Sequence, residues 1–149
     1  MTMKAYTEWT LKELWEHEQR NFSAHIAIMF QYLQEQGLAV EDFIRYTGEK
    51  VLPSWQHRGD TPEIMMNGIL RNVLANGGSV LNVLIEDRQA EATVTGLLRL
   101  DVTEHYGITP ELAQLFWDKF IPIAEALGMR FTWKRTPAGH DHIQLVKVA

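Results

Sequence analysis

The chain has 149 residues, 46% of them hydrophobic and 22% charged, as expected for a single domain over residues 1–149. Its net charge is −5 and it has no basic run, so we expect no nucleic-acid partner. The lack of cysteine excludes disulfides, zinc–thiolate sites and thiol nucleophiles. Residues 1–6 lack the apolar core of a signal peptide, and no apolar run could span a bilayer. We therefore expect a cytoplasmic protein without a membrane partner.

The first predicted element is a long helix over residues 7–36. Thr10 and Glu13 match a capping box, so this helix begins at Thr7 or restarts at Thr10. Gly37 is well suited to end it.

Two shorter helices follow in the predicted order. The second helix covers residues 40–52, because Pro53 stops it and residues 54–59 form a loop. The third covers residues 62–76 and is apolar over more than half of its circumference, which predicts the central buried helix.

An alternating hydrophobic pattern then predicts two β-hairpins. Their strands cover residues 80–86, 90–98, 129–135 and 142–148. In the second hairpin we place Arg135 opposite His142. The residues facing the core are then Met129, Phe131, Trp133, Val146 and Val148.

The segment between the hairpins is predicted to be an irregular link over residues 100–108 and a helix over residues 110–127. Pro122 should loosen the helical turn before it. The element order ααα-ββ-α-ββ predicts an α+β fold, with helices packed on one face of a four-stranded antiparallel sheet.

Polar residues interrupt the apolar arc of the first helix. At 100° per residue, Glu18, Asn21 and His25 fall on or beside this arc. The arc is centred on Leu11, Trp15, Phe22, Ile26, Met29 and Leu33. Burying an unpaired polar group costs about 1–3 kcal/mol, so the three residues either line a site or satisfy one another.

Further side chains are candidates for a ligand site. Tyr32 lies on the flank of the same arc, and Lys119 lies on the core stripe of the helix over residues 110–127. Such a lysine more often extends to solvent than into a pocket. Glu104, His105 and Tyr106 form either a pocket edge or a surface loop.

A metal site is not predicted. His17 and His25 are separated by roughly 12 Å of helix rise, which is too far for both to bind one ion. A metal at His25 would need ligands such as His57, Glu63 or His105. We expect neither a metal nor a cofactor.

Two further groups have alternative interpretations. Trp117 and Ile121 point away from the core stripe, so their helix is either buried on both sides or forms a homodimer contact there. At the second hairpin tip, the proximity of His140, Asp141 and His142 suggests a general base, but hairpin tips are usually solvated.

The last third of the chain resembles the C-terminal half of L-2-amino-thiazoline-4-carboxylic acid hydrolase-like proteins and, more distantly, vinyl-reductase-like small-molecule-binding domains. The similar segments are Thr95-Gly96-Leu97-Leu98, Tyr106-Gly107-Ile108-Thr109-Pro110-Glu111-Leu112, Ala126-Leu127-Gly128 and Gly139-His140-Asp141. The resemblance implies a ligand-binding domain, often dimeric. Cysteines of those families are replaced here, for example by Leu98 and His142, so no thiol- or metal-dependent activity is implied.

Three functions remain open on these observations. The first is a homodimeric domain that binds a small, partly apolar molecule between the first helix, the third helix and the sheet. The second is a hydrolase of a small cyclic amide-like substrate, with His25 as base and Glu18 as its orienting partner. The third is a structural or protein-interaction module without a ligand.

Overall fold

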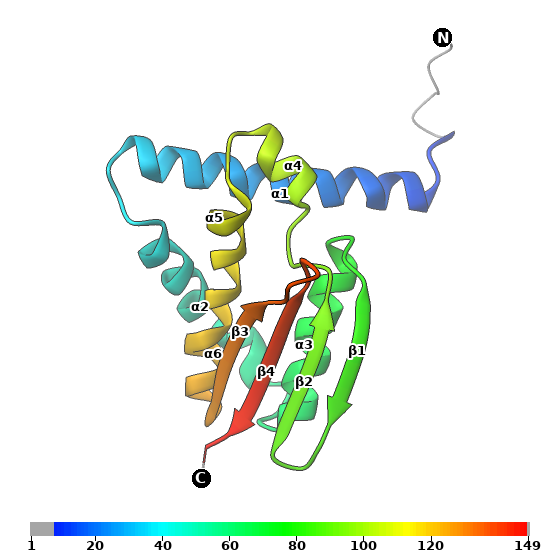
Figure 1. Cartoon of the computed structure of the whole chain (residues 1–149), viewed down its shortest axis with the longest axis vertical. Helices are drawn as coiled ribbons and strands as arrows, with labels where there is room; N and C mark the ends of the chain where they lie inside the picture. The colour runs from blue at the N-terminus through cyan, green and yellow to red at the C-terminus, as the bar shows by residue number, and fades with distance from the viewer. Residues whose placement is uncertain (1–7, 149) are drawn as a thin grey trace.

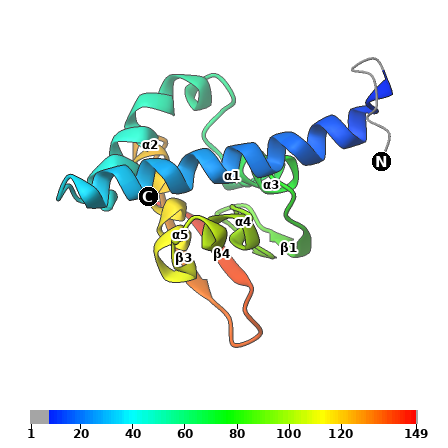
Figure 2. The same ribbon diagram turned by 90° about the horizontal axis from the view of Figure 1, so that it is seen from above.

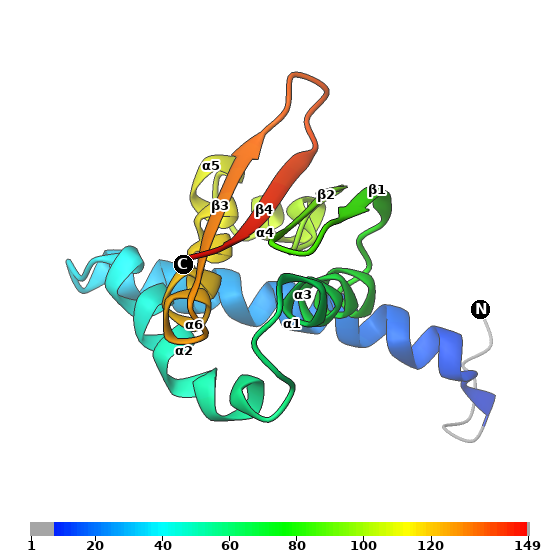
Figure 3. The ribbon, with the colours of Figure 1, turned by 90° about the horizontal axis from the view of Figure 1, so that it is seen from below.

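The sheet and the helices form the predicted α+β arrangement, seen in Figure 1. This computed structural model describes residues 8–148, so Thr7 and the N-terminal segment before it lie outside the described residues. The sheet is antiparallel throughout, in the order β1-β2-β4-β3. Its strands are β1 (Val80–Ile85), β2 (Gln89–Val94), β3 (Met129–Arg135) and β4 (Asp141–Lys147). Helices α3 and α6 pack against one face of the sheet, as the view from below in Figure 3 shows.

Helix α1 (Leu11–Glu35) begins where the capping box predicts. The Thr10 side chain accepts a hydrogen bond from the backbone N–H of Glu13, and the Glu13 side chain accepts one from that of Thr10. The helix then runs across one end of the molecule, as Figures 1 and 2 show.

Helix α2 (Val40–Gln56) is longer than predicted: it continues past Pro53, which was expected to end it. The last turn buries Trp55, whose ring meets Phe120 edge-on at 5.7 Å between centroids. Burying a tryptophan side chain is worth several times the hydrogen bond that proline removes, so tertiary packing extends the helix past the proline. Helix α3 (Pro62–Ala75) follows and is capped by the Thr61 side chain.

The pairing of β3 with β4 differs by one residue from the prediction. Arg135 lies opposite Asp141 rather than His142. This shift turns Ile143 and Leu145 to the core in place of Val146 and Val148, since side chains alternate between the two faces of a strand. Both predicted hairpins are nevertheless confirmed.

The segment between the hairpins is more helical than predicted. It contains α4 (Leu100–His105), where an irregular link was expected. The predicted single helix is divided into α5 (Pro110–Gln114), the 3₁₀-helix η2 (Leu115–Lys119) and α6 (Phe120–Ala126). The 3₁₀ turns lie directly before Pro122, which confirms that the proline loosens the preceding helix.

Helix α2 lies very close to η2 because Gly48 has no side chain. A Cβ atom there would overlap the carbonyl oxygen of Lys119 and lie 2.7 Å from the Pro122 ring. This close approach completes the core beneath the sheet. The opposite face of the sheet is open in Figure 1 and carries half-buried polar residues, including Glu91, Thr93 and His142.

Candidate functional site

Helix α1 contacts the core through a face that overlaps the predicted one only in part, where Ile26 is buried and Phe22 and Leu33 are partly buried. Its buried residues are Gln19, Ser23, Ile26, Ala27 and Phe30. Small side chains at Ser23 and Ala27 let neighbouring elements approach closely, so packing favours this stripe over the larger apolar arc. The prediction that Glu18 and His25 lie on a buried face is therefore wrong, because both are exposed.

The proposed pairing of His25 with Glu18 within one chain is also wrong. Seven residues of helix separate them by roughly 10 Å along the axis. The His25 ring donates its Nδ1–H to the Asn21 carbonyl oxygen at 2.7 Å instead. Tyr32 is 60% exposed. Of the residues predicted to bind a ligand, Asn21 lines a groove between α1 and α4, and Glu18, His25, Tyr32 and Lys119 do not line that groove.

That groove lies between α1 and α4 and has a volume of about 430 Å³. Helix α1 contributes one wall, and α4 with the residue after it contributes the other. The lining residues are His17, Arg20, Asn21, Ala24, Asp101, Val102, His105 and Tyr106. The prediction of a pocket edge at His105 and Tyr106 fits this arrangement, although the wall is helical rather than a loop.

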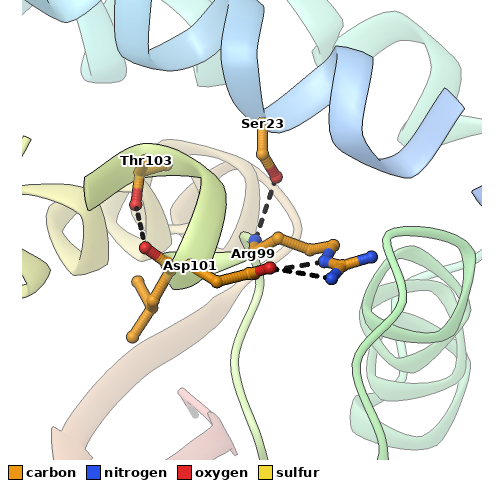
Figure 4. A network of polar contacts seen from close by, with 5 residues as sticks. Ser23, Arg99, Asp101 and Thr103 are labelled. Atoms are coloured by element: carbon orange, nitrogen blue, oxygen red, sulfur yellow. Dashed lines mark hydrogen bonds and ion pairs between the residues drawn. The ribbon is translucent and has the colours of Figure 1, made fainter. Parts of the chain in front are cut away.

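Hydrogen bonds attach α4 to α1 and shape the groove. The Ser23 hydroxyl, fully buried, accepts the backbone N–H of Arg99 at 2.9 Å, as Figure 4 shows. The Gln31 side-chain amide donates to the carbonyl of Tyr106. Within α4, buried Thr103 donates its hydroxyl hydrogen to the carbonyl oxygen of Leu100. These contacts hold α4 in a fixed position as one wall of the groove.

The charges at the groove favour an anion. Asp101, its only acidic lining residue, is bound by the Arg99 guanidinium through two hydrogen bonds of 2.9 and 3.2 Å. The hydrogen bond from Arg99 holds the pKa of Asp101 below its ordinary value. Within residues 8–148, the exposed Arg20 forms no ion pair. An unpaired guanidinium and two imidazoles therefore face this groove.

A second hollow lies on the open face of the sheet and has a volume of about 200 Å³. The His142 ring there contacts Glu91 at 3.4 Å and the Thr93 hydroxyl at 3.1 Å. Because these polar groups satisfy one another, they offer fewer free partners to a ligand than the α1–α4 groove does.

Lys119 lies away from the groove and faces aromatic rings. Its Nζ is 4.5 Å from the ring centroid of Phe116 and 5.0 Å from that of Phe120. Desolvation lowers the pKa of Lys119 to about 8. The prediction that Lys119 binds the same ligand as Asn21 has no geometric support here, since Lys119 does not line the groove.

Trp117 is fully buried, so the predicted exposed patch of Trp117 and Ile121 is wrong. Its indole N–H donates to Oδ2 of Asp141 at 2.9 Å, while the Gln114 amide donates to Oδ1 at 3.0 Å. Ile121 is half-buried against the core. This segment is thus buried on both sides, which was the alternative interpretation.

Asp141 is 1% exposed and connects the last hairpin to η2. Burial raises the pKa of Asp141, opposed by the Trp117 hydrogen bond and by the charges of Arg135 and His140. The solvated hairpin tip predicted around Asp141 is therefore wrong at this residue. Asp141 is therefore placed as a hydrogen-bond acceptor in the core rather than as a solvent-accessible general base.

Both charged side chains of the groove apart from the histidines, Arg20 and Asp101, were missed at the level of sequence. On α1 alone Arg20 is an ordinary exposed residue, and only the position of α4 beside it makes it part of a groove. Asp101 belongs to a segment predicted to be irregular. The usable signal was the spacing of His17, Asn21 and Ala24, which places them along one side of α1.

Two observations on the described residues, and two comparisons with known proteins, complete the description of the site. Among residues 8–148, no three histidine or acidic side chains are grouped so that they could hold a metal ion. None of the described helices is both long and apolar enough to cross a bilayer. No protein-family model and no curated protein matches the chain.

Proposed function

We propose that the protein is a cytoplasmic small-molecule-binding domain whose ligand lies in the groove between α1 and α4. The observation that carries this proposal is a groove of about 430 Å³ lined by Arg20, which forms no ion pair with residues 8–148. Its volume falls within the range typical of ligand sites, about 300–1,000 Å³. This location replaces the predicted one between α1, α3 and the sheet.

The lining favours a small organic carboxylate. Arg20 supplies a planar pair of N–H donors that suits a carboxylate, and His17 and His105 supply further donors. Ala24, Val102 and the Tyr106 side chain provide apolar contact area. An aromatic or short aliphatic acid matches both features.

The first prediction concerns Arg20 and a matched pair of probes. Benzoate and hexanoate should raise the melting temperature of the wild-type protein, whereas benzamide and hexanamide should not, because the amides lack the charge. Arg20→Gln should weaken carboxylate binding at least tenfold, measured by calorimetric titration.

Arg71→Gln is the matched control, since Arg71 is an exposed arginine on α3. It should bind the acids as the wild type does. Equal binding by Arg20→Gln, or no response of the wild type to either acid, would overturn the proposal.

A further inference from the structure

Helix α1 exposes a second apolar stripe that the described elements cover only in part: the Trp15 indole N–H donates to the Ala75 carbonyl oxygen at 3.0 Å, and the Phe22 ring lies edge-on to Phe116. The large apolar side chains on it are Leu11 (86% exposed), Leu14 (50%), Trp15 (48%), Ile28 (47%), Met29 (42%) and Tyr32 (60%). This stripe lies roughly 130° around the helix from the buried one, at 100° per residue. Figure 2 looks down on α1, and no other drawn element crosses over it. We call this face, completed by Glu18, Asn21, Phe22 and His25, the outer stripe.

The outer stripe follows a seven-residue repeat. Its positions are 11, 18, 25 and 32, then 14, 21 and 28, then 15, 22 and 29. Such a repeat keeps one seam of a helix facing a second helix. The buried stripe of α1 serves the core of this chain, so the outer stripe is available for a partner helix.

The positions of the outer stripe are symmetric about a point between Asn21 and Phe22. An antiparallel copy of α1, related by a two-fold axis at that point, pairs residue i with residue 43 − i. Leu11 then faces Tyr32, Leu14 faces Met29 and Trp15 faces Ile28. Each large apolar side chain thereby meets another one from the second copy.

The same axis gives the polar residues Glu18 and His25 of the outer stripe partners in the second copy. Glu18, alone in its own chain, faces His25 of the second copy, and this contact occurs twice. With Nδ1–H of His25 donated to the Asn21 carbonyl, the imidazolium form of the ring has its Nε2–H left to donate to that carboxylate. Opposite charge at facing positions of the two copies is the complementarity that a self-associating surface requires.

We propose that two copies of the chain form a homodimer through antiparallel pairing of their α1 outer stripes. The six large apolar side chains, which are 42–86% exposed, present roughly 600 Å² per copy, at about 150–250 Å² for a large side chain. With the neighbouring polar residues this approaches the approximately 800 Å² per partner of a stable interface. The proposal does not depend on the α1–α4 groove.

The charge pair gives the first test, by sedimentation velocity at tens of micromolar. The wild type should sediment as a dimer of the 17.2 kDa chain. His25→Glu places two carboxylates opposite each other at both contacts and should weaken the dimer at least tenfold. Adding Glu18→Lys to His25→Glu should restore dimerisation to within threefold of the wild type.

Two control variants make the outcome specific. Gln34→Glu adds the same charge to an exposed position of α1 outside the stripe and should leave the dimer unchanged. Leu84→Lys changes the exposed edge strand β1 and should also leave it unchanged. A monomeric wild type, no effect of His25→Glu, or dissociation caused by Leu84→Lys would overturn the proposal.

Disulfide trapping tests the register, since the chain has no cysteine of its own. Leu14→Cys and Met29→Cys, mixed and oxidised, should form a mixed disulfide that intact-mass spectrometry identifies. Each variant alone should not cross-link, because its two copies lie roughly 22 Å apart along antiparallel helices. Cross-linking of each variant to itself, or none in the mixture, would refute the antiparallel register.

Discussion

Asp141→Ala should lower the free energy of unfolding by about 3–5 kcal/mol, because it removes the acceptor of two buried donors. The indole N–H of Trp117 and the amide of Gln114 both bind this carboxylate. Water cannot replace this acceptor without cost in a core where Trp117 is fully buried, so both donors lose their partner. Urea denaturation followed by tryptophan fluorescence measures the effect.

Asp141→Asn is the matched control for this site. An asparagine keeps one acceptor for Trp117, and its amide donates to the Gln114 oxygen once the Gln114 side chain is turned over. The variant should therefore stay within about 1 kcal/mol of the wild type or exceed its stability, since it also removes a buried charge. A loss as large as that of Asp141→Ala would contradict this account.

The stability of the wild type relative to Asp141→Asn should depend on pH with a defined sign. Because burial raises the pKa of Asp141 in the folded state, the folded state retains the proton after the unfolded state has lost it. The contribution of Asp141 to stability therefore falls as the pH rises from the ordinary pKa of 3.8 through the raised one. The unfolding free energy of the wild type minus that of Asp141→Asn should therefore become smaller, or more negative, as the pH rises over that interval.

Lys119→Met should raise the free energy of unfolding by about 2 kcal/mol at pH 7, because it removes a poorly solvated ammonium group. The contacts with the Phe116 and Phe120 rings offset only part of the desolvation, since the pKa of Lys119 stays lowered to about 8. Lys50→Met on the exposed side of α2 should change stability by less than about 0.5 kcal/mol.

The advantage of Lys119→Met should shrink at alkaline pH. Between pH 8 and the ordinary pKa of 10.5, the unfolded wild type holds a proton that the folded wild type has released. Wild-type stability then gains with rising pH relative to the variant. Urea titrations at pH 7, 9 and 10 measure this trend, and a constant difference across the three would refute it.

Signals confined to a few neighbouring residues could be predicted from the sequence alone. Thr10 with Glu13 marks the start of α1, and Thr61-Pro62 marks that of α3. The alternating pattern identifies both hairpins, and Pro122 marks the loosened turn. Each signal acts within one turn or one strand, so the local chain determines it and with it the α+β order.

Features that depend on distant partners were decided by the tertiary structure. Asp141 is aligned with Arg135 because its carboxylate is bound by Trp117 and Gln114 from another element. Helix α2 continues past Pro53 because Trp55 is buried against Phe120. No local pattern contains those contacts.

The candidate site shows the same division. Helix α1 carries two stripes that could be buried, and periodicity favours the one with larger apolar side chains. The chain buries the other, because Ser23 accepts the backbone N–H of Arg99 and Ala27 is small enough for close packing. Sequence determined that α1 is a helix with polar residues on an apolar face. Only the tertiary structure decided which face meets the core, since that choice depends on the shape and donors of the elements packed against it.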